Sequence, residues 1–463
     1  MNQPLPLAPD APRLFLDPAL AVECRNVTRT IHQFTKHHEP LIVPDKPWEQ
    51  AVIIYGAVWP QPGGFAMWYC TALNPEGVSH AYATSEDGIR WHKPDLGLVE
   101  WGGSRANNLL FEPGRVRIID SAQVVKHDPP PAPDRAYVMV HTVAEWDTNE
   151  KWYESLASPD GIHWNPLKRF RFSPASPDRA CLTFDPLTGE YVLYHRCQFA
   201  TPEVAAREGD YYYGRAVQRA TSADLVNWSE PTLVMHADAD DPLGTDIYSL
   251  MAWRYGDAWL GLPQAFRGHP QDGVVEVQAG YSADGIEWRR ERTPVIPLGG
   301  PGDWDRFNTS VASRPIEVRD EWWVYYAGRT QRHKPYAGDD AGAHSSAIGL
   351  ARIGRERLAS YDASFSGGTV VTPPLLLDTD ELFLNAAARW GEIVVEALDE
   401  AGSLVATSHP VREDAIRVPV RWASGSLTRL RGATIRLRLA LRNARVYALA
   451  AGAAQTPNSP AGL

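Results

Sequence analysis

The chain has 463 residues, a formal net charge of -11 and 44% hydrophobic residues, with 36 Gly, 38 Pro, 17 Trp and 18 Tyr. This length exceeds one ordinary core and fits a large closed β-architecture plus one further domain, and the composition suits short strands and tight turns. The negative charge is spread along the chain without a Lys/Arg block, which argues against nucleic acid or an anionic membrane as a partner. A neutral or polyol-like ligand fits better.

The N-terminal residues lack the basic region and the unbroken apolar run of a signal peptide, and no stretch of about 18 apolar residues occurs. We therefore expect a soluble, cytoplasmic protein. Its four cysteines have no metal-ligand spacing and are expected to be free thiols: Cys24, Cys70, Cys181 and Cys197. Cys181 and Cys197 flank an expected hairpin and could face each other across it, although two small packed hydrophobes are the simpler interpretation. We expect no metal and no obligatory cofactor.

Residues 1–45 are expected to wrap the domain that follows and to help close it. Between residues 46 and 362 the pattern Ser-x-Asp-(Gly)-aliphatic-x-Trp occurs four times, at intervals of roughly 60 to 70 residues. The four copies are Ser85–Trp91, Ser158–Trp164, Ser222–Trp228 and Ser282–Trp288. Asp-Gly supplies a tight turn with a residue at positive φ, and the aliphatic and Trp residues give an outer strand something large to pack. The pattern predicts the outer hairpin of a repeated sheet, with a structural role for its Asp.

The same order of strands precedes each turn. In the third copy the strands are Ala180–Phe184, Tyr191–His195 and Gly214–Ala220. A fifth copy lacks the Trp pattern but keeps the strands Glu321–Ala327 and Ala347–Arg352. Four-stranded units repeated five times around an axis form a five-bladed β-propeller, which protects strand edges by radial closure.

After Tyr361 the pattern changes to alternation of apolar and polar residues with period two, which predicts a half-buried antiparallel sandwich over residues 363–451. Expected strands are Glu392–Leu398, Ile416–Trp422 and Ile435–Leu441. Residues 452–463 are expected to be a disordered tail. The predicted fold class is therefore all-β, a five-bladed β-propeller followed by a C-terminal β-sandwich.

An acid stands at or just before each predicted inner strand. These acids are Glu49, Asp120, Asp178, Asp246 and Asp305. Inner strands of a propeller begin on one face, so their first side chains converge. Carboxylates crowded at one mouth must pair with bases such as Arg117 and Arg179 or hold a raised pKa, which general acids need. The alternative is that each Asp only forms a turn before its strand.

The ends of the second strands and the loops that follow add candidates on the same face. They are His141, His195, Arg196, Gln264 and Arg329, followed by a loop that contains His344. Trp304 lies between two acids and could stack on a sugar ring. A packing role is the alternative for each residue, and Arg196 and Arg329 fit a hydroxylated ligand best because a guanidinium forms bidentate hydrogen bonds. The sequence shows no zinc spacing, no phosphate-binding Gly-rich loop before a helix and no Gly-x-Ser-x-Gly motif.

The repeated Ser-x-Asp-Gly-x-x-Trp turns, together with Pro297–Trp304 and Ala347–Arg352, resemble those of glycoside hydrolase families 32 and 43, the fructan and arabinan enzymes. The resemblance implies that acids of the first three inner strands act as nucleophile or base, as transition-state or pKa-tuning residue, and as acid; Glu49, Asp120 and Asp178 match these positions. The chain lacks Asn-Asp-Pro-Asn, Arg-Asp-Pro and Glu-Cys at these three places. It therefore resembles a divergent branch, in which Asp246 is an alternative acid.

These observations predict a glycoside hydrolase or glycosyl-transferring enzyme that acts on a short furanoside, fructosyl or arabinosyl, by paired carboxylates. Its partner would be a small oligosaccharide. A non-catalytic sugar-binding propeller is one alternative. A phosphate-dependent glycoside phosphorylase is another and would need a basic cluster, for which Arg179, Arg196 and Arg329 are candidates. The sequence leaves open the sugar, the linkage, the stereochemical outcome and the oligomeric state.

Overall fold

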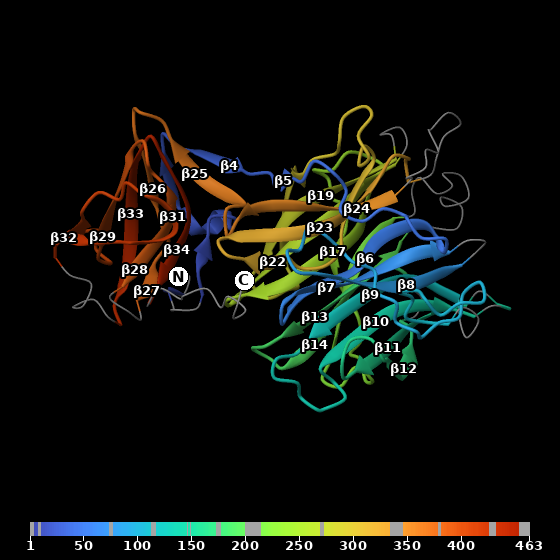
Figure 1. Cartoon of the computed structure of the whole chain (residues 1–463). Coiled ribbons are helices and arrows are strands. Elements are labelled where there is room, and N and C mark those ends of the chain that lie inside the picture. The colour runs from blue at the N-terminus through green and yellow to red at the C-terminus, as the bar shows by residue number, and fades with distance from the viewer. Residues whose placement is uncertain are drawn as a thin grey trace.

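The computed structural model describes residues 4–7, 11–73, 77–112, 117–145, 147–148, 150–172, 177–199, 214–268, 273–333, 346–377, 381–425 and 432–452, with only the backbone for 117–120. The fold is all-β, since the single helical element among these residues is the short 3-10 helix η1 (Pro18–Leu20). No described helix is long and apolar enough to cross a membrane. Figure 1 shows two groups of sheets, with the strands that follow Asp362 gathered on one side.

Three small antiparallel sheets follow one another in the first group, and each is built from consecutive strands. The first contains β6 (Glu49–Gln61), β7 (Gly64–Leu73) and β8 (Val78–Ser85). The second contains β9 (Arg117–Lys126), β10 (Tyr137–Ala144), β11 (Lys151–Ser158) and β12 (Asn165–Phe170). The third contains β13 (Ala180–Asp185), β14 (Glu190–Gln198), β15 (Arg215–Ser222) and β16 (Thr232–Met235).

A fourth and a fifth unit are joined into one nine-stranded sheet by a single parallel residue pair, Val275 with Asn308. The fourth unit contains β17 (Thr245–Tyr255), β18 (Ala258–Arg267), β19 (Val274–Ser282) and β20 (Trp288–Ile296). The fifth contains β21 (Asn308–Val311), β22 (Ile316–Val318), β23 (Glu321–Arg329), β24 (Ser346–Gly354) and β5 (Thr35–Lys36). The N-terminal segment therefore supplies the strand β5, which pairs with β24.

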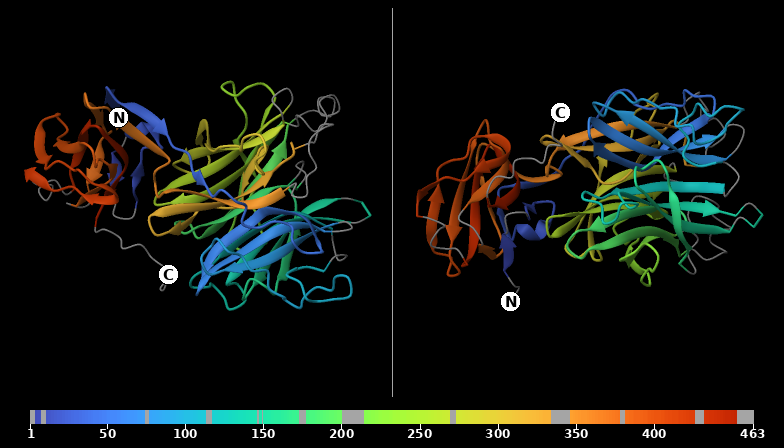
Figure 2. Two further views of the ribbon diagram at one scale, coloured as in Figure 1. Left: turned by 45° about the horizontal axis from the view of Figure 1, so that its top comes forward. Right: turned by 60° about the horizontal axis from the view of Figure 1, so that its bottom comes forward.

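The innermost strands of the five units contact one another in sequence order. β6 packs against β9, β9 against β13 and β13 against β17, while β21 contacts both β18 and β6. The last unit thus meets the first, and Figure 2 shows the units side by side from two further directions.

The repeated turns link neighbouring units. In each turn the residue at positive φ offers its carbonyl oxygen to a side chain of the preceding unit, and the first turn docks on the fifth unit. The four hydrogen bonds are Tyr325 OH to Gly88 O (2.8 Å), Trp68 Nε1 to Gly161 O (2.7 Å), Ser155 Oγ to Leu225 O (2.8 Å) and Tyr194 OH to Gly285 O (3.0 Å). These hydrogen bonds therefore connect the same pairs of neighbouring units as the contacts between the inner strands.

The third turn has Leu225 where the others have glycine, and the docking partner explains why. A Cβ at Gly161 would lie 2.6 Å from the Trp68 ring, and one at Gly285 would lie 2.7 Å from the Tyr194 hydroxyl. Leu225 instead meets the small Ser155, so its fully buried side chain has room despite a φ of 68°.

The second group of sheets combines C-terminal and N-terminal strands. One eight-stranded sheet contains β26 (Gly368–Val371), β27 (Leu375–Leu377), β29 (Glu392–Leu398), β30 (Leu404–Ser408), β32 (Trp422–Ser424) and β33 (Thr434–Arg442), with β1 (Leu5–Leu7) and β3 (Glu23–Arg25). The six-stranded sheet contains β25 (Ala359–Ala363), β28 (Leu382–Ala387), β31 (Asp414–Pro419) and β34 (Ala444–Ala451), with β2 (Arg13–Leu14) and β4 (Thr28–Ile31). Side chains of both sheets share one core that includes Leu384, Val395, Leu437 and Val446.

One predicted strand is divided. The alternating residues Ile416–Trp422 were expected to form a single strand, but β31 ends at Pro419 and β32 begins at Trp422 in the other sheet. Proline has no N–H to continue a ladder, so the chain crosses between the sheets at this point.

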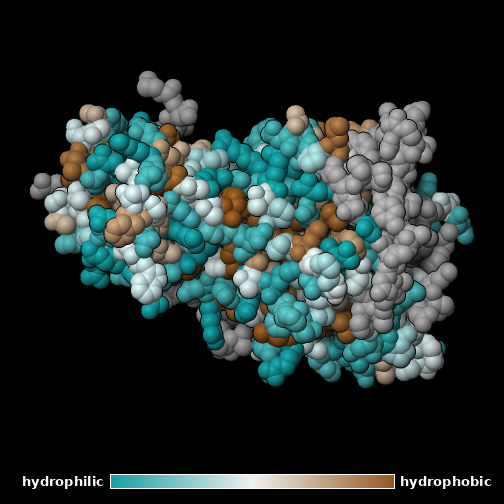
Figure 3. Space-filling model, turned by 90° about the horizontal axis from the view of Figure 1, so that it is seen from above, coloured by the Kyte–Doolittle hydropathy of each residue, from teal (hydrophilic) through white to brown (hydrophobic). Residues whose placement is uncertain are grey.

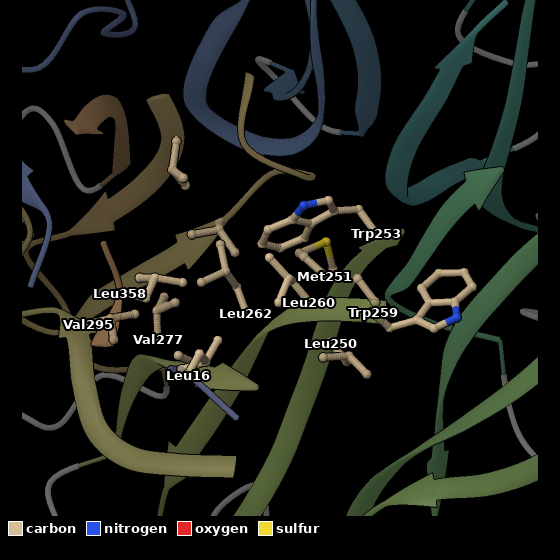
Figure 4. Close-up of a cluster of buried hydrophobic side chains, with 14 of the residues drawn as sticks. Leu16, Leu250, Met251, Trp253, Trp259, Leu260, Leu262, Val277, Val295 and Leu358 are labelled. Atoms are coloured by element: carbon tan, nitrogen blue, oxygen red, sulfur yellow. The ribbon is translucent and has the colours of Figure 1, made fainter. Parts of the chain in front are cut away.

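The largest hydrophobic cluster among the described residues is centred on the fourth unit and extends into the third unit, the fifth unit and the N-terminal segment. Figure 4 shows Leu16 and Leu358 beside side chains of β17, β18, β19 and β20, among them Trp253, Trp259 and Val295. Burial of each such side chain contributes about 1.5–3 kcal/mol. The surface in Figure 3 is mostly hydrophilic with scattered hydrophobic residues where atoms are described.

The four cysteines form no disulfide with one another. The hairpin register places Cys181 opposite Tyr194 and Cys197 opposite Ala216, so the two thiols do not face each other.

Candidate active site

The acids singled out from the sequence lie at or near the first residues of the inner strands. Glu49 begins β6, Asp120 is in the first half of β9, and Asp246 is the second residue of β17. Asp178 and Asp305 stand shortly before β13 and β21. The side chains of Arg117 and Asp120 lie outside the described part of the chain.

Asp178 forms a tight ion pair with Arg196 of the neighbouring strand β14. Its carboxylate also accepts a hydrogen bond from the backbone N–H of Arg179 at 2.8 Å. Burial alone would raise the pKa of Asp178, but the charges of Arg196 and Lys151 outweigh it and lower the pKa below its ordinary value. With 22% of its side chain exposed, Asp178 is an ionised carboxylate that solvent can reach.

The backbone beside Asp178 touches the strand that carries Asp120. Thr142, which stands opposite Asp120 in the sheet, donates its hydroxyl to the carbonyl of Asp178 at 3.0 Å. Ser121 Oγ accepts from the N–H of Ala180 at 3.3 Å, and its φ of 62° marks a bulge in β9. The backbone of Asp178, just before β13, is therefore held close to β9, the strand that carries Asp120.

Asp246 is fully buried and engages Arg215 twice, through the backbone N–H at 3.0 Å and Nη1 at 2.6 Å. Arg215 lies with its guanidinium carbon 5.8 Å from the Tyr248 ring centroid, and Arg196 lies 4.8 Å from the same centroid. Asp178 keeps the pKa of Arg196 above its ordinary value even though burial opposes this. Tyr248 thus joins two arginine–aspartate pairs, and its hydroxyl lies 3.2 Å from His333 Nε2.

Arg179 differs from these two arginines because no described carboxylate forms an ion pair with its guanidinium. It is buried, its guanidinium carbon lies 3.6 Å from the Tyr55 ring centroid, and Nη2 donates to the carbonyl of Val311 at 2.6 Å. Its Nε and Nη1 have no hydrogen-bond partner among the described residues, and the same holds for Nε and Nη1 of Arg196. A buried guanidinium needs electrostatic compensation, and the Tyr55 ring supplies part of it.

Gln264 approaches the same carbonyl from the fourth unit. Its Nε2 lies 3.4 Å from Val311 O, while its buried Oε1 has no partner in the described structure. Gln123 connects the inner strands further, since its Nε2 donates to the carbonyls of Gly56 at 3.1 Å and Ala312 at 2.9 Å. These amides bind the inner strands together at the centre.

His195 lies beside Arg196 on β14 and stacks on Phe172 with centroids 4.4 Å apart. Burial lowers its pKa to about 4, so the imidazole is neutral at physiological pH. It therefore adds no charge next to Asp178.

Glu49 and Asp305 occupy separate environments. Glu49 is buried and bound by Lys93 Nζ at 2.5 Å and Tyr69 OH at 2.9 Å. Asp305 is bound by Lys36 Nζ at 2.7 Å and Tyr326 OH at 2.8 Å, and Lys36 belongs to the N-terminal strand β5. Each of these carboxylates is therefore satisfied within its own unit and the N-terminal segment.

Trp304 stacks on Tyr326 with centroids 5.4 Å apart and lies directly over two glycines. A Cβ at Gly328 or Gly349 would come within 2.3 or 2.5 Å of the Trp304 ring. These contacts place the ring against β23 and β24. Arg329 ends β23, and its carbonyl accepts from the N–H of Phe307 at 3.1 Å.

His141 belongs to a buried polar chain that the sequence did not reveal. His141 Nε2 lies 3.1 Å from Glu154 and its Nδ1 lies 3.1 Å from His80 Nε2, while His80 Nδ1 lies 3.4 Å from Cys70 Sγ. Burial holds the pKa of His80 well below its ordinary value. This series of contacts links the first two units.

Sequence reasoning also missed Arg215 and Tyr248. Tyr248 stands two residues after Asp246, and an aromatic residue beside a strand-initial acid was a usable signal. Arg215 comes from another unit, and no local pattern pairs it with Asp246.

Neither the family models nor the curated protein sequences compared with the chain gave a match. Several solved structures, in contrast, resemble the chain in fold. A protein titled "Glycoside hydrolase" is 13% identical over 70% of this chain and 94% of its own, with a TM-score of 0.51. A structure described as a BT0996 RGII complex is 13% identical over 69% of this chain and 92% of its own, also with a TM-score of 0.51. A thermostable family-43 glycoside hydrolase is 11% identical over 66% of this chain and 91% of its own, with a TM-score of 0.44. At these identities the likeness is one of fold, and the chain shares its all-β fold with a solved glycoside hydrolase.

Proposed function

We propose that the chain is a glycosidase-like enzyme whose five units are the blades of a five-bladed propeller, over about residues 46–362. The contacts of the inner strands and the docking of the first repeated turn on the fifth unit support a closed ring. Residues 363–451 would form a β-sandwich completed by strands of the segment 1–45. The predicted tail, except for Gly452, lies outside the described residues. A cytoplasmic location remains part of the proposal.

The observation that carries the proposal is the state of Asp178. It is ionised by Arg196, partly exposed, and anchored next to the strand that carries Asp120. A carboxylate with a lowered pKa suits a general base or nucleophile rather than a proton donor. We therefore assign the base or nucleophile to Asp178, although the resemblance to families 32 and 43 implied the acid at this position.

Asp120 is the candidate proton donor. Glu49, Asp246 and Asp305 are each held by a cation, with Lys93, Arg215 and Lys36 as the respective partners. These three carboxylates are thus engaged with cations of the protein itself, which leaves them poorly placed to reach a leaving group. Asp120 is the remaining acid of the set, and glycoside cleavage uses a pair of carboxyl groups that flank the scissile bond. The substrate would be a short furanoside, fructosyl or arabinosyl.

A second function has its own support. The Nε and Nη1 atoms of Arg179 and Arg196 have no hydrogen-bond partner among the described residues. They favour an anionic group, which in a phosphate-dependent phosphorylase would be the attacking phosphate. A sugar-binding propeller without catalysis is the third possibility, and it predicts binding without turnover.

The test is a screen of aryl-furanosides and small fructans with and without inorganic phosphate. Release of the aryl group without phosphate supports the hydrolase. Release that needs phosphate and yields a sugar phosphate supports the phosphorylase. Binding without release under either condition would contradict both enzymatic assignments.

A further inference from the structure

The six-stranded sheet carries an open cleft of about 730 Å³, far in sequence from Asp178, which we call the Trp390 cleft. Its floor is a row of residues in cross-strand register, one each from β4, β25, β34, β28 and β31. The row is Thr28, Asp362, Arg445, Ala387 and Asp414. A concave site of this volume falls within the range that small ligands occupy.

Trp390 lines the cleft from the turn after β28, and 81% of its surface is exposed. The turn that carries it is fixed. The carbonyl oxygen of Trp390 accepts a hydrogen bond from Asn443 Nδ2 at 2.8 Å, and the N–H of Gly391 donates to the carbonyl of Ala388 at 3.0 Å. A Cβ at Gly391 would lie 1.9 Å from the carbonyl of Arg442, so only glycine fits this approach. The turn therefore fixes the backbone from which an exposed aromatic ring projects, which suits an aromatic stacking platform.

The charges that line the cleft compensate one another. Arg445 Nε lies 3.0 Å from Asp362, and Asp414 pairs with Arg357 at 2.8 Å. Arg389 also lines the cleft, with its guanidinium carbon 5.5 Å from the Trp390 ring centroid. Two arginines, Arg389 and Arg445, therefore stand beside two aspartates in the lining, and this balance of charge does not favour a strongly ionic ligand. Arg445 and Asp414 are nevertheless 52% and 47% exposed, so each keeps donor or acceptor positions that a ligand can use.

The apolar part of the lining is small. Apart from Trp390, its only apolar members are Ala363, Ala387 and Ala444. Small side chains leave a shallow floor beside the ring and form no deep apolar pocket. This combination suits a flat ligand with one apolar face and a rim of hydroxyls, rather than a hydrophobic molecule or a peptide side chain.

We propose that the Trp390 cleft is a binding site for a neutral oligosaccharide, in which one sugar ring stacks on Trp390 and its hydroxyls bond to Arg445 and Asp414. The site goes beyond the proposed catalytic function and does not depend on it, because it lies on the sheet of β25, β28 and β34 whereas Asp178 precedes β13 (Figure 1). The cleft would hold a polymeric substrate or product near the enzyme and adds no catalytic group.

Affinity electrophoresis of the full chain in native gels tests the proposal, with soluble arabinan, levan or galactan as neutral probes and polygalacturonate as an anionic probe. We expect at least one neutral polysaccharide to slow the wild-type protein. Trp390→Ala should weaken that binding at least about tenfold, because a stacked aromatic ring is lost. Trp390→Phe should keep part of the retardation, since a smaller ring remains.

Phe365→Ala is the matched control. Phe365 is 79% exposed and belongs to the same half of the molecule, but it does not line the cleft, so its removal should leave the retardation unchanged. The proposal is overturned if no neutral polysaccharide slows the wild-type protein, if Trp390→Ala migrates like wild type, or if only polygalacturonate causes retardation. Turnover of a small aryl glycoside is measured separately, so a failed catalytic assignment leaves this result interpretable.

Discussion

Aspartates at the centre of the first five units and aspartates in their outer turns share a chemical group but are stabilised in different ways. In the turn, Asp160 Oδ1 accepts from the N–H groups of Ile162 at 2.9 Å and His163 at 2.8 Å, all within one tight loop. At the centre, Asp178 and Asp246 depend on Arg196 and Arg215, which come from other strands. The turn carboxylates are satisfied by the backbone next to them, whereas the central ones have cations brought by the fold. The difference teaches that the partners of a turn aspartate can be identified from the local sequence, whereas the partners of a central aspartate become visible only in the folded chain.

The largest effect on turnover is expected from Asp178→Asn. The substitution nearly retains volume but removes the charge that a base or nucleophile needs, so turnover of the active substrate should fall by about 10²–10⁴-fold or more. Steady-state kinetics measures the loss. Circular dichroism verifies that the fold persists although Arg196 loses its charged partner.

Asp87→Asn is the control from the outer turns. Asp87 caps the N–H groups of Ile89 and Arg90, so its replacement should change stability modestly and leave turnover near normal. If Asp178→Asn and Asp120→Asn both keep wild-type turnover, the central aspartates are not catalytic and do not differ in function from the turn aspartates.

A large loss of stability is expected from Gly161→Ala in the second turn. The residue has a φ of 77°, and the new Cβ would lie 2.6 Å from the Trp68 ring, so strain and overpacking together should cost roughly 2–4 kcal/mol. Urea unfolding measures this cost. Gly97→Ala is the matched control, since its φ is 73° and no atom lies within 4 Å, and it should cost only about 1 kcal/mol. Equal costs at the two positions would show that the turn does not dock tightly on its neighbour.

A smaller, pH-dependent effect is expected at Glu154, which has 11% of its side chain exposed and is bound by His141 and Arg169. Burial alone would raise its pKa, but these two partners lower it to about 2 from 4.5. Because the folded-state pKa is lowered, the stabilisation is complete above about pH 5 and is lost as the pH falls toward 2. It should amount to at most about 3 kcal/mol. The difference in urea midpoint between wild type and Glu154→Gln should therefore be smaller at pH 3 than at pH 6.

Asp160 also has a pKa lowered to about 2, but 43% of its side chain is exposed. Solvent screening weakens the contribution of Asp160 to the free energy of unfolding. Asp160→Asn should therefore change the loss of stability between pH 6 and pH 3 less than Glu154→Gln does. A larger change at Asp160 than at Glu154 would reverse the expected order of the buried pair and the exposed turn.

The sequence was informative where structure is local. The four Ser-x-Asp turns and the strand Glu392–Leu398 were identified from spacing and alternation, and the structure has β29 at those residues. The partners of the turns were not identified, because Trp68, Ser155 and Tyr194 each act from a neighbouring unit. The central acids show the same limit. Asp178 and Asp246 were identified from their place at or before the start of a strand. The contact of Arg196 and Arg215 with one Tyr248 ring was not identified, because it depends on how the units pack.

The pairing of N-terminal with C-terminal strands has a consequence for synthesis. Arg13 pairs with Leu449, Thr28 with Asp362 and Thr369 with Arg25, so both sheets of the second group need residues from opposite ends of the chain. The strands of residues 13–31 must therefore wait for their partners until residues 359–451 have been synthesised. Such distant pairing slows folding and leaves strand edges open to aggregation in the meantime, so this protein should depend on chaperones more than its separate units would.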